Sequence, residues 1–128
     1  MTQEDAVQHW FNGAQRNLGI AKDLVKLKHY DWALFLGQLA LEKLLKGLIA
    51  QKTGKLPPFI HDLPKLMETA GVPLSKKQTE DLVEITRFHV QARYEDIKYE
   101  LYKTATKEYT GEWFKKIEDF FLCFKKLY

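Results

Sequence analysis

The sequence predicts an all-α protein, an up-and-down antiparallel bundle of four long helices and one short helix. Apolar residues recur at intervals of three and four along most of the chain. No stretch alternates apolar and polar residues for long enough to make a strand, and only seven glycines and four prolines interrupt the 128 residues. Because compact domains commonly span about 100–150 residues, we expect residues 1–128 to form one domain.

The first two helices are expected over residues 7–27 and 32–52. The apolar residues of the first helix share one face and lie at Val7, Trp10, Phe11, Ala14, Leu18, Ala21, Leu24, Val25 and Leu27. Asp31 is a suitable N-cap for the second helix. The second helix is apolar around most of its circumference, so we expect it at the centre of the bundle.

A loop and a short helix are expected next. Gly54 is suited to a helix C-cap, and Pro57 and Pro58 cannot continue a helix. Asp62 then marks the start of a short helix over residues 62–70, with a proline acceptable in its first turn.

The last third of the chain predicts two more helices. Ser75 is a good N-cap for the first of them, whose inner face carries Leu82, Ile85, His89 and Ala92. Residues 95–106 show no sustained period and are assigned to no element. Residues 107–127 form the last helix, and its broad aromatic face either packs in the core or is shared with a second copy. Cys123, inside this helix, is expected to be a small buried residue.

Composition excludes several classes of function. The single cysteine rules out an intramolecular disulfide and a cysteine-rich zinc site, and it favours a reducing, cytoplasmic location. No apolar run reaches the roughly 20 residues of a membrane span. The four histidines are not spaced in pairs on one helical face and no HExxH motif is present, so we expect no metal site. The net charge of +3 permits a nucleic-acid partner without requiring one.

Polar residues lie in one line along the predicted central helix. Gln38, Glu42 and Lys46 are spaced four apart, and Lys43 is adjacent. Glu42 and Lys46 have the favourable orientation of an i,i+4 ion pair, worth about 0.2–0.5 kcal/mol on an exposed helix. A solvated face and a functional polar line inside the bundle both account for this pattern.

Two further polar groupings follow. Asp62 is expected to cap the short helix, and His61 beside it is either a titratable group or a structural hydrogen-bond donor. Arg93, followed by Tyr94, can bind a phosphate through two parallel hydrogen bonds or pair with a carboxylate such as Glu42.

Taken in order, these groupings resemble the HEPN domain family of small helical-bundle proteins. The resemblance covers nearly the whole chain. In the first two predicted helices it is carried by Trp10, Ala14, Leu18, Ala21, Leu24, Tyr30, Ala33, Phe35, Gln38, Glu42, Lys43, Leu45 and Lys46. In the remainder it is carried by Pro57, Pro58, His61, Asp62, Leu63, Leu66, Ala92, Arg93, Tyr94 and Asp96.

The resemblance implies nucleotide or RNA binding and a partner chain. Many members of the family are encoded beside a minimal nucleotidyltransferase, with which they form a toxin–antitoxin pair, and a homodimer is also expected. Other members are metal-independent endoribonucleases that need an Arg followed after four to six residues by His. No arginine in this sequence is followed in that way. We therefore expect a non-hydrolytic module without a required cofactor, with ATP or GTP as the candidate ligand.

The resemblance also implies roles for individual residues. Lys43 and Lys46 are expected to attract phosphate, Arg93 to contact phosphate through two hydrogen bonds, and His61 with Tyr94 to contact base or ribose.

Four residues, Gln38, Glu42, Asp62 and Asp96, are assigned to a structural polar network. A partner nucleotidyltransferase modifies a tyrosine in some family pairs, which makes Tyr99 and Tyr102 the candidate acceptors.

Two alternatives stay open. The first is an endoribonuclease with a displaced motif, in which Arg93 acts with His89 or His61. The second is a protein-interaction scaffold, in which Arg93 and Asp62 hold the bundle together and the aromatic last helix recruits a partner.

Overall fold

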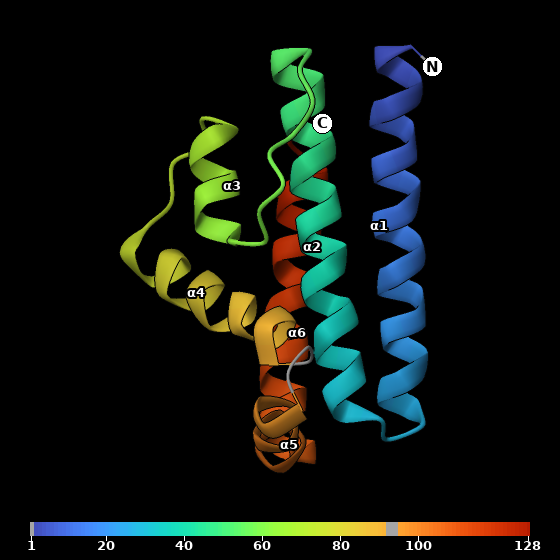
Figure 1. The fold of residues 1–128 in the computed structure, drawn as a ribbon, viewed down its shortest axis with the longest axis vertical. Helices are drawn as coiled ribbons and strands as arrows, with labels where there is room; N and C mark the ends of the chain where they lie inside the picture. Colours follow the sequence, from blue (N-terminus) through green and yellow to red (C-terminus); the bar gives the residue numbers. More distant parts are fainter. Residues whose placement is uncertain (1, 92–94) are drawn as a thin grey trace.

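The computed structural model describes residues 2–91 and 95–128, without the side chains of residues 90, 91 and 95–98. Within these ranges the chain is helical and contains no strand. Its helices are α1 (Gln3–Lys26), α2 (Tyr30–Thr53), α3 (Leu63–Thr69), α4 (Lys76–Gln91), α5 (Glu95–Thr104) and α6 (Lys107–Lys125) (Figure 1). The predicted helical bundle is confirmed. None of the described helices is long and apolar enough to cross a membrane.

The helix α2 is the centre of the bundle, as its sequence predicts. It packs against each of the other five helices. It runs antiparallel to α1, because Gln3 Nε2 at the start of α1 donates to the carbonyl of Ala50 near the end of α2 (3.0 Å). It runs in the same direction as α6, with α4 crossing at an angle (Figure 1). Its fully buried leucines are Leu34, Leu41, Leu44, Leu45 and Leu48.

Two local expectations for helix starts are confirmed. The Asp62 carboxylate accepts the backbone N–H of Lys65 (3.1 Å) and caps α3. Ser75 Oγ accepts the N–H of Gln78 (3.1 Å) while the Gln78 side chain accepts the N–H of Ser75 (2.9 Å), a reciprocal cap before α4. Gly54 ends α2 in the left-handed conformation, at φ 68°, as expected of a C-cap glycine.

Two other local expectations are wrong. Asp31 is not the N-cap of α2, because that helix begins at Tyr30 and its N-cap, His29, makes no side-chain capping bond. The Asp31 carboxylate instead lies in the first turn, where it opposes the positive end of the helix dipole. Residues 95–104 form the helix α5 although their apolar residues lack a sustained period. Among the α5 side chains that the structure describes, Leu101 is buried and packs in the core.

The aromatic face of α6 packs in the core. Its buried apolar residues are Phe114, Ile117, Phe120, Phe121 and Phe124. Cys123 is exposed, contrary to the expectation of a buried thiol. The reason is helical register, because the neighbours Phe121 and Phe124 point inward and leave residues 122 and 123 on the outer face, where Leu122 is 57% exposed.

Two glycines let α2 approach its neighbours closely. A Cβ built on Gly37 would lie 2.9 Å from the Cδ1 atom of Ile117 in α6. A Cβ built on Gly47 would lie 2.9 Å from the Cβ of Trp10 in α1 and would collide with the hydroxyl of Tyr128. The Tyr128 hydroxyl donates to the carbonyl of Leu44, and burial raises the pKa of this phenol.

Gly47→Ala is therefore expected to destabilise the protein by about 1–3 kcal/mol, because the added methyl group overpacks the contact with Trp10 and Tyr128. Gly19→Ala is the matched control, since no atom lies within 4 Å of a Cβ at that exposed position in α1. There, alanine is expected to stabilise by about 0.5–1 kcal/mol through helix propensity. Urea denaturation of the two variants measures both effects, and equal stabilities would contradict the close packing at Gly47.

Candidate functional site

The carboxylate of Glu42 lies at the centre of a polar cluster on α2. Its Oε2 pairs with the Lys46 ammonium at 3.1 Å. Its Oε1 accepts a hydrogen bond from Gln38 Nε2 (3.2 Å) and lies 2.9 Å from His61 Nδ1. Gln38 Nε2 also donates to the backbone carbonyl of His61 (3.2 Å), which ties the loop after α2 back to the helix. Glu42 therefore has a polar partner on each of its oxygens.

This cluster is buried, so a solvated face is the wrong interpretation of the polar line. Gln38, Glu42 and Lys46 are exposed by only 0%, 4% and 6%. The sequence pattern resembles a surface ion pair, but α2 is covered by other helices along this line. A buried pair differs from a surface pair because each charge depends on the other for compensation.

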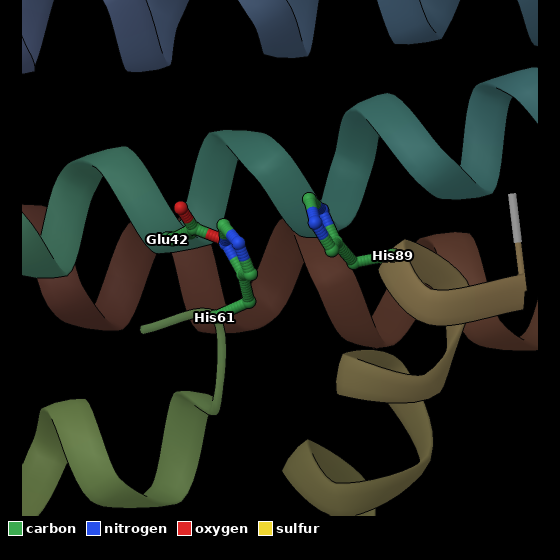
Figure 2. A group of neighbouring side chains, drawn as sticks. All are labelled: Glu42, His61 and His89. Atoms are coloured by element: carbon green, nitrogen blue, oxygen red, sulfur yellow. The ribbon is translucent and has the colours of Figure 1, made fainter. Parts of the chain in front are cut away.

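Two histidines from distant segments meet beside Glu42 (Figure 2). His61 comes from the loop between α2 and α3, and His89 comes from α4. Their rings stack with centroids 3.9 Å apart and an interplanar angle of 24°. His89 also stacks on Phe35 of α2 (5.5 Å) and is 5% exposed, which confirms the expected place on the inner face of its helix.

Glu42, His61 and His89 form a group whose ligand atoms all lie within 4.8 Å of one another. The spacing of histidines along the chain predicted no metal site. That reasoning does not detect a group assembled from α2, a loop and α4, because 28 residues separate the two histidines. No signal in a single sequence marks their meeting.

The residues predicted to contact a nucleotide occupy two places in the described part of the chain. Lys46 and His61 belong to the polar cluster around Glu42. Lys43 instead points toward α1 and lines a different cavity. Arg93 and Tyr94 lie outside the described residues.

The structural polar network predicted from sequence is present in part. Gln38 and Glu42 are bonded to each other as described above. Asp62 contributes by capping α3. The side chain of Asp96 is outside the described part of the structure.

The cavity beside Lys43 has a basic and aromatic lining that the sequence reasoning missed. Its volume is about 390 Å³, and it is lined by His9, Trp10, Gly13, Arg16, Asn17, Ile20 and Lys43. Neither Arg16 nor Lys43 has an ion-pair partner among the residues that the structure describes. The signal available in the sequence was the spacing of Trp10, Gly13, Asn17 and Ile20 by three and four, which places them on one face of α1.

The candidate tyrosine acceptors are accessible. Tyr99 and Tyr102 in α5 are 60% and 65% exposed, and their rings stack at 6.3 Å. The ammonium of Lys103 lies 4.9 Å from the Tyr99 ring centroid. Both hydroxyls are therefore on a surface that a partner protein can reach.

Replacing Lys46 by Met is expected to destabilise the protein by about 3–5 kcal/mol, because Glu42 then keeps a buried charge without its cation. The double variant Glu42→Gln/Lys46→Met should be more stable than Lys46→Met alone, since it removes the uncompensated charge. Lys22→Met is the control, because the Lys22–Glu118 pair is roughly half exposed and worth at most about 1 kcal/mol. Thermal and urea unfolding measure these differences. Equal small losses of stability in Lys46→Met and Lys22→Met would contradict the mutual dependence of Glu42 and Lys46 as a buried pair.

Comparison with known proteins agrees with this architecture. No curated protein sequence matches the chain. The crystal structure of TT1696 from Thermus thermophilus is similar at 21% identity, covers 95% of this chain and 98% of that chain, and superposes with a TM-score of 0.79. At that identity the likeness shows a shared fold. Residues 7–127, nearly the whole chain, match the family model of the HEPN domain, and the chain therefore belongs to the HEPN domain family.

Proposed function

We propose that this chain is a non-hydrolytic HEPN module that binds a nucleotide or RNA and acts together with a partner nucleotidyltransferase, in the manner of a toxin–antitoxin pair. The family membership supports the nucleotide- or RNA-related part of this proposal. The observation that carries it is the basic cavity between α1 and α2, with Arg16 and Lys43 in its lining.

The lining of that cavity suits a phosphate attached to a base. Arg16 offers a planar guanidinium for paired hydrogen bonds to phosphate, and Lys43 offers a compact positive charge. Trp10 supplies an aromatic surface on which a base can stack. A volume of about 390 Å³ falls within the usual range of small-ligand sites.

Gly13 keeps Lys43 beside this cavity. A Cβ at Gly13 would lie 3.4 Å from the Cδ of Lys43 and 3.6 Å from its ammonium nitrogen. The lysine side chain thus lies close over the backbone of α1, at a point where the helix has no side chain. This contact favours a position of the ammonium group next to Trp10 and Arg16, which line the same cavity.

The cavity and the buried cluster are linked through Trp10. The Lys46 ammonium, paired with Glu42, lies 5.9 Å from the centroid of the Trp10 ring. A base stacked on Trp10 would therefore contact a ring that also packs near Lys46 and the Glu42 cluster. In this proposal Lys43 binds the phosphate directly, whereas Lys46 contributes indirectly, by its contact with the Trp10 ring.

Two observations favour binding over cleavage. The chain lacks an Arg followed after four to six residues by His, the arrangement of the ribonuclease members of the family. His89, the histidine nearest to Arg93 in the sequence, is 5% exposed, whereas a general acid or base must reach the reacting group. No cofactor is needed for binding in this proposal.

A second chain completes the proposed assembly, either a second copy or the nucleotidyltransferase. The loop between α2 and α3 presents two large apolar side chains to solvent, Leu56 at 75% and Phe59 at 87% exposed. In this proposal these two side chains are part of the contact with the second chain.

Titration calorimetry with ATP and GTP, and fluorescence anisotropy with a labelled single-stranded RNA, test the binding proposal. Arg16→Ala and Lys43→Ala are each expected to weaken binding about 10–150-fold, since each removes a charge-assisted hydrogen bond worth about 1.5–3 kcal/mol. Lys65→Ala, an exposed lysine on α3, is the matched control and should bind as the parent protein does. Arg93→Ala, measured alongside, tests the phosphate contact implied by the family.

Absence of binding to all three ligands would contradict the proposal. RNA cleavage in EDTA that is lost in His61→Ala would contradict its non-hydrolytic part and favour the endoribonuclease alternative.

Modification of tyrosine tests the nucleotidyltransferase partnership. In the proposed step the Tyr99 or Tyr102 hydroxyl oxygen attacks the α-phosphorus of ATP, the bond to pyrophosphate breaks, and the tyrosine proton passes to solvent. Peptide mass spectrometry after incubation with the partner and ATP is expected to find the adduct in α5 and to lose it in Tyr99→Phe/Tyr102→Phe. Tyr128 is the internal control, because its hydroxyl is bonded to the Leu44 carbonyl. Absence of an adduct, or an adduct on Tyr128, would reject this step.

A further inference from the structure

We propose that Glu42, His61 and His89 form a binding site for one divalent transition-metal ion of the Zn²⁺ type. The three side chains converge from α2, the following loop and α4 (Figure 2), and their ligand atoms lie within 4.8 Å of one another. The basic cavity beside Lys43 is lined by other residues, so this proposal does not depend on nucleotide binding.

The donor set selects the kind of metal. Two imidazole nitrogens and one carboxylate oxygen suit Zn²⁺, Co²⁺, Ni²⁺ and Cu²⁺. Mg²⁺ and Ca²⁺ prefer sites made entirely of oxygen ligands, whereas two of the three ligand atoms of this cluster are nitrogens. Three protein ligands leave one position of a tetrahedral ion for water or for an anionic oxygen, such as that of a phosphate.

One of the distances is already close to that between ligand atoms around a bound ion. Bonds of about 2.0–2.1 Å in a tetrahedral site separate neighbouring ligand atoms by about 3.4 Å. His61 Nδ1 and Glu42 Oε1 are already 2.9 Å apart. Glu42 and His89 are buried on helices, whereas the His61 side chain is 43% exposed and lies in a loop. His61 is therefore the ligand that adjusts. Its ring must turn out of the stack on His89, because the in-plane nitrogen lone pairs of two stacked imidazoles do not meet at one ion.

The surroundings of Glu42 match the outer shell of a metal site. Ligating carboxylates are commonly held by further hydrogen bonds, which orient them toward the ion. Lys46 holds Oε2 at 3.1 Å, which leaves Oε1 as the oxygen that faces His61. Gln38 donates to this oxygen through Nε2, and the Oε1 of Gln38 is buried without a hydrogen-bond partner in the described part of the protein. This amide oxygen can accept a hydrogen bond from a metal-bound water.

Titration of the untagged, metal-free protein with Co²⁺ is the direct test. We expect one Co²⁺ per chain, visible absorption bands typical of a tetrahedral nitrogen and oxygen environment, and loss of these bands on addition of Zn²⁺. Zn²⁺ should also raise the melting temperature, because it binds the folded state preferentially.

Variants assign the binding to this cluster. His61→Ala is the main variant, because this half-exposed residue lies in a loop and not in a helix. Loss of outer-shell partners alone weakens metal binding about 10–100-fold, so loss of a ligand is expected to weaken it more than about 100-fold. His9→Ala and His29→Ala are the matched controls, since these exposed histidines lie outside the cluster, and both should keep the parent affinity.

Histidine ring resonances provide a readout that needs no variant of buried His89. In ¹H–¹⁵N spectra, Zn²⁺ should shift the ring signals of His61 and His89 and leave those of His9 and His29 unchanged. No Co²⁺ absorption in the parent protein, unchanged affinity in His61→Ala, or shifts confined to His9 and His29 would each overturn the proposal.

Discussion

Burying the Glu42 carboxylate and the Lys46 ammonium inside the bundle constrains every element around them. Both charges leave water, and the pair is favourable only when each group keeps its partner and the remaining polar atoms are bonded. Gln38 and His61 meet that condition at Glu42 Oε1. The loop after α2 must therefore return to the helix at the position of His61, and α4 must pack beside it. The fold and the candidate site thus depend on one set of contacts.

The bundle separates two kinds of polar surface along α2. On the side of α1, Lys43 joins Arg16 in a cavity open to solvent, where positive charge is free to meet an anion. On the side of α3 and α4, Glu42 and two histidines form a largely enclosed group. The two differ in charge as well as access, because one is cationic and the other contains a carboxylate. The helix α2 can therefore present side chains of different chemistry on its two sides.

The helices and their ends were largely predictable because they depend on neighbouring residues. Gly54, Asp62 and Ser75 each act within a few residues of their own position, and the structure confirms them. Asp31 was wrongly predicted as an N-cap, and the helix α5 was not predicted at all. In both places tertiary packing decides the structure, because the local sequence favours the alternatives almost equally. The spacing of Glu42 and Lys46 was visible in the sequence, but their burial depends on which helices cover α2. The meeting of His61 with His89, and of Lys43 with Arg16, arises only from tertiary structure.

The loop between α2 and α3 controls the access of solvent to the group formed by Glu42, His61 and His89. It is held by the Gly54 cap at one end and by the Gln38 bond to the His61 carbonyl at the other. Between these anchors Leu56 and Phe59 are exposed and contribute little packing, whereas Pro57 is buried and Ile60 packs against the core. Such a segment can open at a free-energy cost well below that of global unfolding. Access of solvent to Glu42 would then depend on local opening of this loop, while the helices of the bundle keep their packing.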